Sequence, residues 1–125
     1  MKKEEKQLLL KDLCAREPYH PRIQVFNQGY EGFRDGEFDT NLWLHHIDAF
    51  RFDRIEILPY LRPMESMTVE ELSFYNNHLI TPGIAILEEK LSEYLDWMHS
   101  HHFDYRGLIE KGLALEAPAG MYKNE

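Results

Sequence analysis

Cysteine is nearly absent from this chain: Cys14 is the only one among 125 residues. A single cysteine excludes an internal disulfide and a zinc cluster built on cysteines. It falls on the apolar face of the first predicted helix, so we expect a buried and inert thiol.

Long apolar runs are missing too. None approaches the ~20 residues of a membrane span, and residues 8–10 are too short a run for a signal peptide, so we expect a cytoplasmic protein without membrane contact.

Basic clusters are also lacking: none occurs after residue 16, and the formal net charge is −8. Because a nucleic-acid binder needs a basic surface to meet the phosphates, we expect no nucleic-acid partner. The acids gather in residues 65–96, which hold seven acids against Lys90 alone. Such a surface usually serves solubility. A basic protein partner and an acidic mimic of nucleic acid are the alternatives.

Known catalytic patterns are missing as well. The chain has no glycine-rich phosphate loop, no Gly-x-Ser-x-Gly turn and no second cysteine. Whether the protein is an enzyme stays open; we favour a non-enzymatic protein and expect no cofactor.

The histidines near residue 100 are the one chemically suggestive feature. His99 and His102 are three positions apart on a predicted helix, so they face the same way, and Asp104 follows closely. These residue types ligate divalent metals, which makes the three a candidate metal site. Histidine is also favoured at a helix C-terminus, where its positive charge meets the helix dipole. Both interpretations stay open.

The length and an apolar content of 43% predict one α+β domain. Residues 1–58 read as a helix followed by a β-rich part, residues 59–67 as a junction, and residues 68–125 as a helical part. The predicted sheet is small, antiparallel, curled or barrel-like, with about four short strands. Behind it lies a layer of two to three helices.

The β-rich part follows a first helix over residues 4–15, whose apolar stripe includes Leu9 and Leu13 and leaves Asp12 outside. Alternating residues predict strands over residues 22–26 and 55–58. Residues 41–53 are apolar but break the alternation twice, which predicts two short strands or one bulged strand. Their aromatic residues, with those before them, are expected in the core; an exposed platform is the alternative. These residues are Tyr30, Phe33, Trp43, Phe50 and Phe52.

The junction has the clearest local signals. Pro59 lacks an amide donor, so the strand before it should stop there or run on only as an edge. Thr68 and Glu71 form a capping box that starts a helix with Val69 and Leu72 on one face.

The helical part is predicted from apolar spacing. Residues 84–102 form the most regular helix. Asp104 caps a third helix over residues 105–111, which Gly112 ends. Residues 113–118 are an extended tail or an edge strand.

Five polar residues around the junction are expected to act together, as an internal network that locks the helices to the strands or as a protein-binding surface. They are Tyr60, Arg62, Asp104, Tyr105 and Arg106. We favour the internal network.

Three stretches carry a resemblance: residues 8–16, 59–68 and 101–118. Each is similar to a segment of small uncharacterised proteins from gut Bacteroidales and from their phages and mobile elements. The resemblance implies a compact cytoplasmic protein with a β-rich front and a helical back. It brings no known activity, so it assigns no functional residue.

The sequence therefore leads to three functional hypotheses. The first is an accessory or interaction protein, phage-related, that binds a protein partner or itself. The second is a metal-binding protein or metal-dependent enzyme centred on His99, His102 and Asp104. The third is the acidic mimic of nucleic acid.

Overall fold

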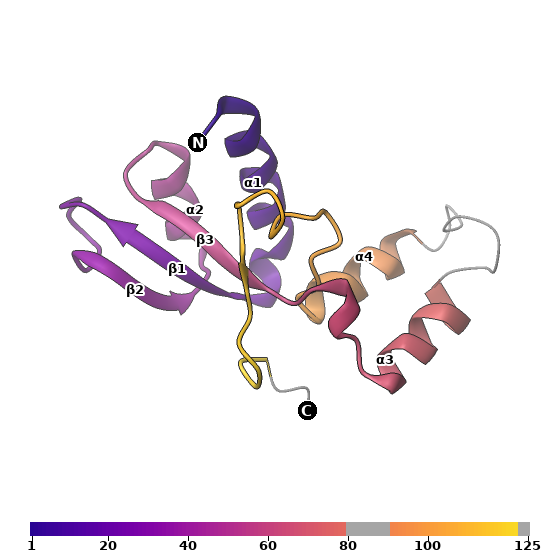
Figure 1. Cartoon of the computed structure of the whole chain (residues 1–125). Helices are drawn as coiled ribbons and strands as arrows, with labels where there is room; N and C mark the ends of the chain where they lie inside the picture. The colour runs from indigo at the N-terminus through magenta and orange to yellow at the C-terminus, as the bar shows by residue number, and fades with distance from the viewer. Residues whose placement is uncertain (80–90, 123–125) are drawn as a thin grey trace.

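The computed structural model describes residues 1–79 and 91–122 (Figure 1). A sheet carries α1 and α2 on one face, and the chain then passes to a helical part at the other end of the molecule. The helices are α1 Lys3–Arg16, α2 Leu44–Arg51, α3 Val69–Phe74 and α4 Leu91–Ser100. The strands are β1 Arg22–Asn27, β2 Gly36–Asn41, β3 Glu56–Leu61 and β4 Leu115–Glu116. This arrangement confirms the predicted α+β class.

The sheet is open and mixed, with the strand order β2-β1-β3-β4. β1 is antiparallel to both β2 and β3, whereas β4 runs parallel to β3. The predicted edge strand in residues 113–118 is therefore present as β4. Since β4 is parallel, the sheet is not purely antiparallel as predicted.

The core lies between the sheet and α1. Ile23 and Val25 of β1 point into it, as the alternation predicted, and they meet the buried Leu9 and Leu13 of α1. Two predictions about α1 were wrong. Cys14 is exposed rather than buried. Asp12, placed outside the stripe, is fully buried because Arg16, one turn later, neutralises it.

The two strands predicted in residues 41–53 were wrong: residues Leu44–Arg51 form α2. The buried members of this stretch include His46, Ile47 and Phe50, whose spacing of three to four is helical. Leu44 is exposed although apolar, and this exposure disguised the helical period.

Pro59 does not stop its strand. β3 continues to Leu61, and Pro59 is the last residue of β3 that pairs with β1, opposite Ile23. From Tyr60 onward β3 pairs instead with β4. The proline therefore lies where the strand changes neighbours, a place where a missing amide donor costs little.

The helical part begins as predicted. Thr68 accepts a hydrogen bond from the Glu71 amide at 3.1 Å, and the Glu71 side chain accepts one from the Thr68 amide at 2.8 Å. A second core cluster joins α4 to the chain after it through Tyr94, Met98 and Phe103. The first part of the predicted helix over residues 84–102 lies outside the described residues.

The third helix predicted over residues 105–111 was wrong, because these residues form turns. Asp104 does accept hydrogen bonds from the amides of Leu108 and Ile109, as a helix cap would, but no helix follows. Gly112 ends the turns with a positive φ of 76°. Within residues 1–79 and 91–122, no helix is long and apolar enough to cross a membrane.

Candidate functional site

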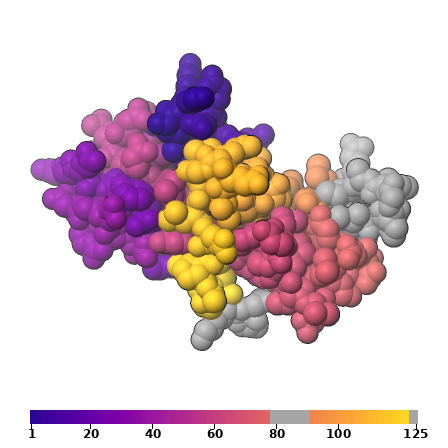
Figure 2. Space-filling view, in the orientation of Figure 1, coloured from indigo at the N-terminus to yellow at the C-terminus, as the bar shows by residue number. Residues whose placement is uncertain are grey.

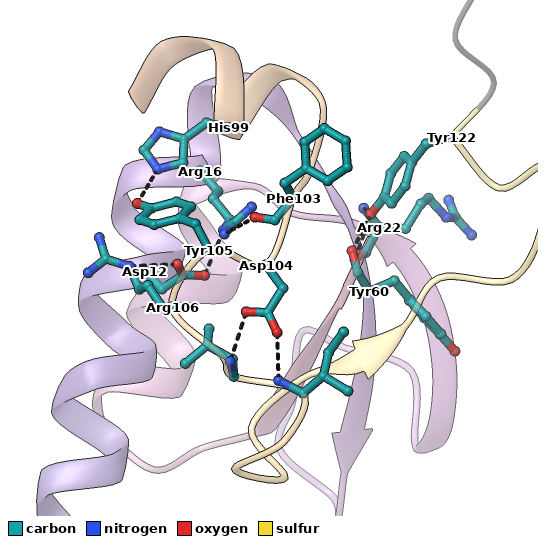
Figure 3. Close-up of polar contacts among 12 residues, drawn as sticks. Asp12, Arg16, Arg22, Tyr60, His99, Phe103, Asp104, Tyr105, Arg106 and Tyr122 are labelled. Atoms are coloured by element: carbon teal, nitrogen blue, oxygen red, sulfur yellow. Dashed lines mark hydrogen bonds and ion pairs between the residues drawn. The ribbon is translucent and has the colours of Figure 1, made fainter. Parts of the chain in front are cut away.

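The three candidate metal ligands are engaged separately. His99 Nε2 lies 2.7 Å from the Tyr105 hydroxyl (Figure 3). Both carboxylate oxygens of Asp104 accept backbone amides, at 2.8 and 3.0 Å. His102 stacks on Tyr122 with 3.8 Å between ring centroids. No three His, Cys, Asp or Glu residues within the described chain are placed to hold a metal ion, so the structure does not bring this candidate site together.

The two histidines of this group are held neutral. Burial lowers the pKa of His102 to about 4, and the nearby Arg16 guanidinium adds to the effect. Burial, followed by Arg16, also lowers the pKa of His99. A neutral buried imidazole on a tyrosine hydroxyl is a packing arrangement, which fits a structural role for His99.

A buried ion cluster links α1 to the chain after α4. Arg16 donates to Asp12 at 2.7 Å and to the Phe103 carbonyl at 2.7 Å, and Arg106 donates to the other Asp12 oxygen at 3.0 Å (Figure 3). The Asp12 and Arg16 side chains are fully buried. Paired and hydrogen-bonded, this cluster fixes the helical end against the sheet end.

Arg62 makes a second link, at the junction. Its guanidinium donates to both carboxylate oxygens of Glu71, at 2.9 and 2.7 Å, and lies 4.3 Å from the centroid of the Phe103 ring. Its backbone exchanges hydrogen bonds with the carbonyl of His102 and the amide of Asp104. Arg62 therefore ties β3 to both α3 and the stretch after α4.

Tyr122 closes the third link. Its hydroxyl accepts from the Arg22 amide and donates to the Tyr60 carbonyl, each at 2.7 Å. Arg22 and Tyr60 lie one step beyond Ile23 and Pro59, the last pair of β1 and β3. The hydroxyl thus bridges the backbone groups where the ladder ends, and the C-terminal stretch lies over the boundary between the two ends of the molecule (Figure 2).

The five polar residues predicted at the junction make mostly internal contacts. Hydrogen bonds within the chain engage Arg62, Asp104, Tyr105 and Arg106. The Tyr60 hydroxyl also stays within the chain, but it donates to Asp39 on β2 and so links two strands rather than a strand and a helix. Asp12, Arg16 and Tyr122 were missed. A signal existed for the first two, since opposite charges four positions apart flank Leu13 on the apolar side of α1.

Exposed apolar side chains in the described chain form two patches, one on α3 with Val69 and Leu72 beside a groove, and one around α2 that carries several aromatic rings and two grooves. Six residues there form what we call the α2 surface: Tyr30, Phe33, Trp43, Leu44, His45 and Phe52. Leu44 is 65% exposed and Phe52 is 64% exposed. The sequence placed most of the aromatic residues of this region in the core, and this was wrong for Tyr30, Trp43 and Phe52, although Phe50 is buried.

Two grooves adjoin at His45 on this surface. One, of about 430 Å³, is lined by aromatic rings and by Ala49, with Glu31, Asp48 and Arg54 among its polar residues. The other, of about 510 Å³, is lined by Glu17, Trp43, Leu44 and His45. The His45 ring stacks on Phe33, with 5.5 Å between centroids. The α2 surface therefore combines projecting apolar side chains with apolar recesses.

The N-terminus of α2 is held rigidly beneath this surface. The Trp43 amide donates to His46 Nδ1 at 3.0 Å, and the Trp43 ring packs against the His20 ring at an angle of 35°, with 4.0 Å between centroids. Burial lowers the pKa of His46 to about 4, and the neighbouring His45 adds to the effect, so the accepting nitrogen stays unprotonated at neutral pH. Trp43 and Leu44 are thereby presented on an ordered helix start.

Comparisons with known proteins identify no relative. No family model, no curated protein and no solved structure matches the chain. The candidate site therefore rests on its own geometry.

Proposed function

We propose that this protein is a non-enzymatic accessory protein that works by binding another protein chain through the α2 surface. A phage or mobile element is the origin that the sequence resemblance implies. The observation that carries the proposal is the gathering of exposed Trp43, Leu44 and Phe52 around two adjoining grooves. Exposed apolar patches that combine aromatic side chains with recesses are typical of protein-binding sites.

The polar groups elsewhere support the same proposal. Catalysis needs a nucleophile, acid or base that faces a substrate. In the described chain, His99, Asp104 and Arg106 are each turned onto other protein groups instead. The Arg106 contact reaches Asp12 of α1 and holds the two ends of the molecule together, which is what a rigid binding scaffold needs.

A capture experiment tests this proposal. The untagged chain and a Leu44→Glu/Phe52→Glu variant are immobilised and exposed to cell lysate and to free chain. We expect the wild type to retain a protein, either another chain or a second copy. The variant should lose this protein, because two apolar side chains that the partner would bury become charged. Equal retention by both would contradict the α2 surface as the binding site.

A further inference from the structure

The α2 surface has the features of a face that binds itself. Leu44 and Phe52 project from the two ends of α2, and a groove lies beside each of them. In a two-fold dimer the same patch meets itself after a half turn, so each projection of one copy meets a recess of the other. A patch that holds both projections and recesses on one helix satisfies that requirement.

The charges of this surface agree. α2 carries Asp48 and Arg51, which pair with each other at 3.9 Å within the chain, and the two grooves add Glu17, Glu31 and Arg54, so the surface holds three acids and two bases. The chain as a whole has a formal net charge of −8, so two copies repel each other over most of their surfaces. A strongly basic or acidic partner would find no single sign of charge along α2. A second copy meets a face that is close to neutral, where the two chains repel each other least.

We propose that the occupant of the α2 surface is a second copy of this chain, in a two-fold dimer whose α2 helices pack antiparallel. Leu44 of one copy enters the groove that Phe52 lines on the other, and the Asp48–Arg51 pair stays within each copy. This inference rests on the proposed function and names the partner of that same site.

The long-range charge predicts the salt dependence of this dimer. The repulsion between two chains of charge −8 is screened as salt is added, whereas the apolar contacts at α2 are not weakened. The Kd for dimerisation therefore falls when salt rises. An interface built on opposite charges would show the reverse.

Light scattering of the purified, untagged full chain tests the proposal. We expect a mass of twice 14.9 kDa at high protein concentration. Leu44→Glu should raise the Kd about tenfold or more, because a charge replaces an apolar side chain that the dimer buries. Val69→Glu is the matched control: it adds the same charge at a side chain that is 82% exposed, at the other end of the molecule, and should leave the Kd unchanged. Circular dichroism confirms that both variants fold.

Three outcomes would overturn the dimer: a monomer up to about 1 mM wild-type protein, equal effects of Leu44→Glu and Val69→Glu, or a Kd that rises with salt. The failure of the dimer is distinguishable from that of the proposed function. A monomeric wild type that captures another protein, and loses it when Leu44 and Phe52 are changed to Glu, overturns the dimer and leaves the α2 surface as a binding site. A monomer that captures nothing overturns both.

Discussion

At the scale of single residues, the buried ion cluster is the most consequential polar feature. Asp12 is fully buried and receives hydrogen bonds from both Arg16 and Arg106. Removing one partner of a buried ion pair leaves the other charge without compensation, which costs far more than losing a surface pair. The cluster links α1 to the chain after α4, so its loss is felt by both ends of the molecule.

Asp12→Asn should lower the free energy of unfolding by about 3 kcal/mol, because Arg16 stays buried without a countercharge. Urea denaturation measures this change. Asp53→Asn is the control: Asp53 also contacts a cation, Lys6, but its side chain is 79% exposed, so the cost should stay below about 1 kcal/mol. Equal costs for the two variants would contradict the buried cluster.

Tyr122 is the second residue with a specific role. Tyr122→Phe keeps the ring that stacks on His102 but removes the hydroxyl that bridges Arg22 and Tyr60. The two backbone groups lose their partner, and we expect the free energy of unfolding to fall by about 2 kcal/mol. Chemical denaturation of the wild type and of the Phe and Ala variants separates the hydroxyl from the ring. No difference between wild type and Tyr122→Phe would show that the bridge contributes nothing.

The residue scale also shows why sequence reasoning missed this cluster. Amphipathic patterns assign charged residues to solvent, because an isolated buried charge is costly. Asp12 and Arg16 escape that rule only because they neutralise each other. The partner of the cluster, Arg106, lies 94 positions away, and a single sequence does not reveal such a pair.

At the scale of elements, the sequence predicted a helix start and a strand correctly where the signal depends only on residues that are close in the sequence. The capping box of Thr68 and Glu71 and the alternation of Ile23 and Val25 each involve neighbours in sequence, and both are present. α2 was missed because its apolar residues divide between core and surface. Ile47 and Phe50 are buried while Leu44 is exposed. The spacing of apolar residues in the sequence therefore does not match the spacing of the buried positions in the helix.

The start of α2 predicts a pH dependence. The pKa of His46 is about 4 in the folded protein, below its ordinary 6.5. Above pH 6.5 His46 is neutral in both the folded and the unfolded chain, so it adds no pH dependence to the free energy of unfolding. Between pH 6.5 and 4 the unfolded chain binds a proton that the folded one does not, so the free energy of unfolding falls, by up to about 2 kcal/mol at pH 5.

Denaturation from pH 7 to pH 5 tests this element. In the His46→Gln variant the free energy of unfolding should fall less between pH 7 and pH 5 than in the wild type. Glutamine does not titrate in this range, and its side-chain oxygen still accepts a hydrogen bond from the Trp43 amide. His45→Gln, a change at the exposed neighbour, removes only the smaller contribution to the lowered pKa of His46, so its slope should lie closer to that of the wild type than to that of His46→Gln. If His46→Gln declines as steeply as the wild type, His46 is not the titrating group.

At the scale of the whole molecule, a sheet end and a helical end are joined by three polar links. The Asp12–Arg106 pair and Tyr122 connect segments far apart in the chain. Arg62 binds Glu71 nine positions on, and its backbone reaches the distant His102 and Asp104. Arg62 and Arg106, two of the residues predicted at the junction, take part in these links together with Asp12, Arg16 and Tyr122. In the described chain, exposed apolar side chains remain on α3 and around α2, and those around α2 combine several aromatic rings with two adjoining grooves.

From the sequence, an exposed aromatic platform that included Phe50 was only the alternative to core packing, and the exposed Leu44 of the α2 surface was not part of it. Aromatic residues are buried in most folds, so exposure of Tyr30, Trp43 and Phe52 follows from tertiary structure and not from residue type.

Hydroxyl-radical footprinting of the wild type at low and high protein concentration tests the central claim most directly. We predict that Trp43, Leu44 and Phe52 become protected as concentration rises while Val69 and Leu72 stay reactive. Unchanged reactivity around α2, or protection at Val69 and Leu72 instead, would contradict self-association through the α2 surface.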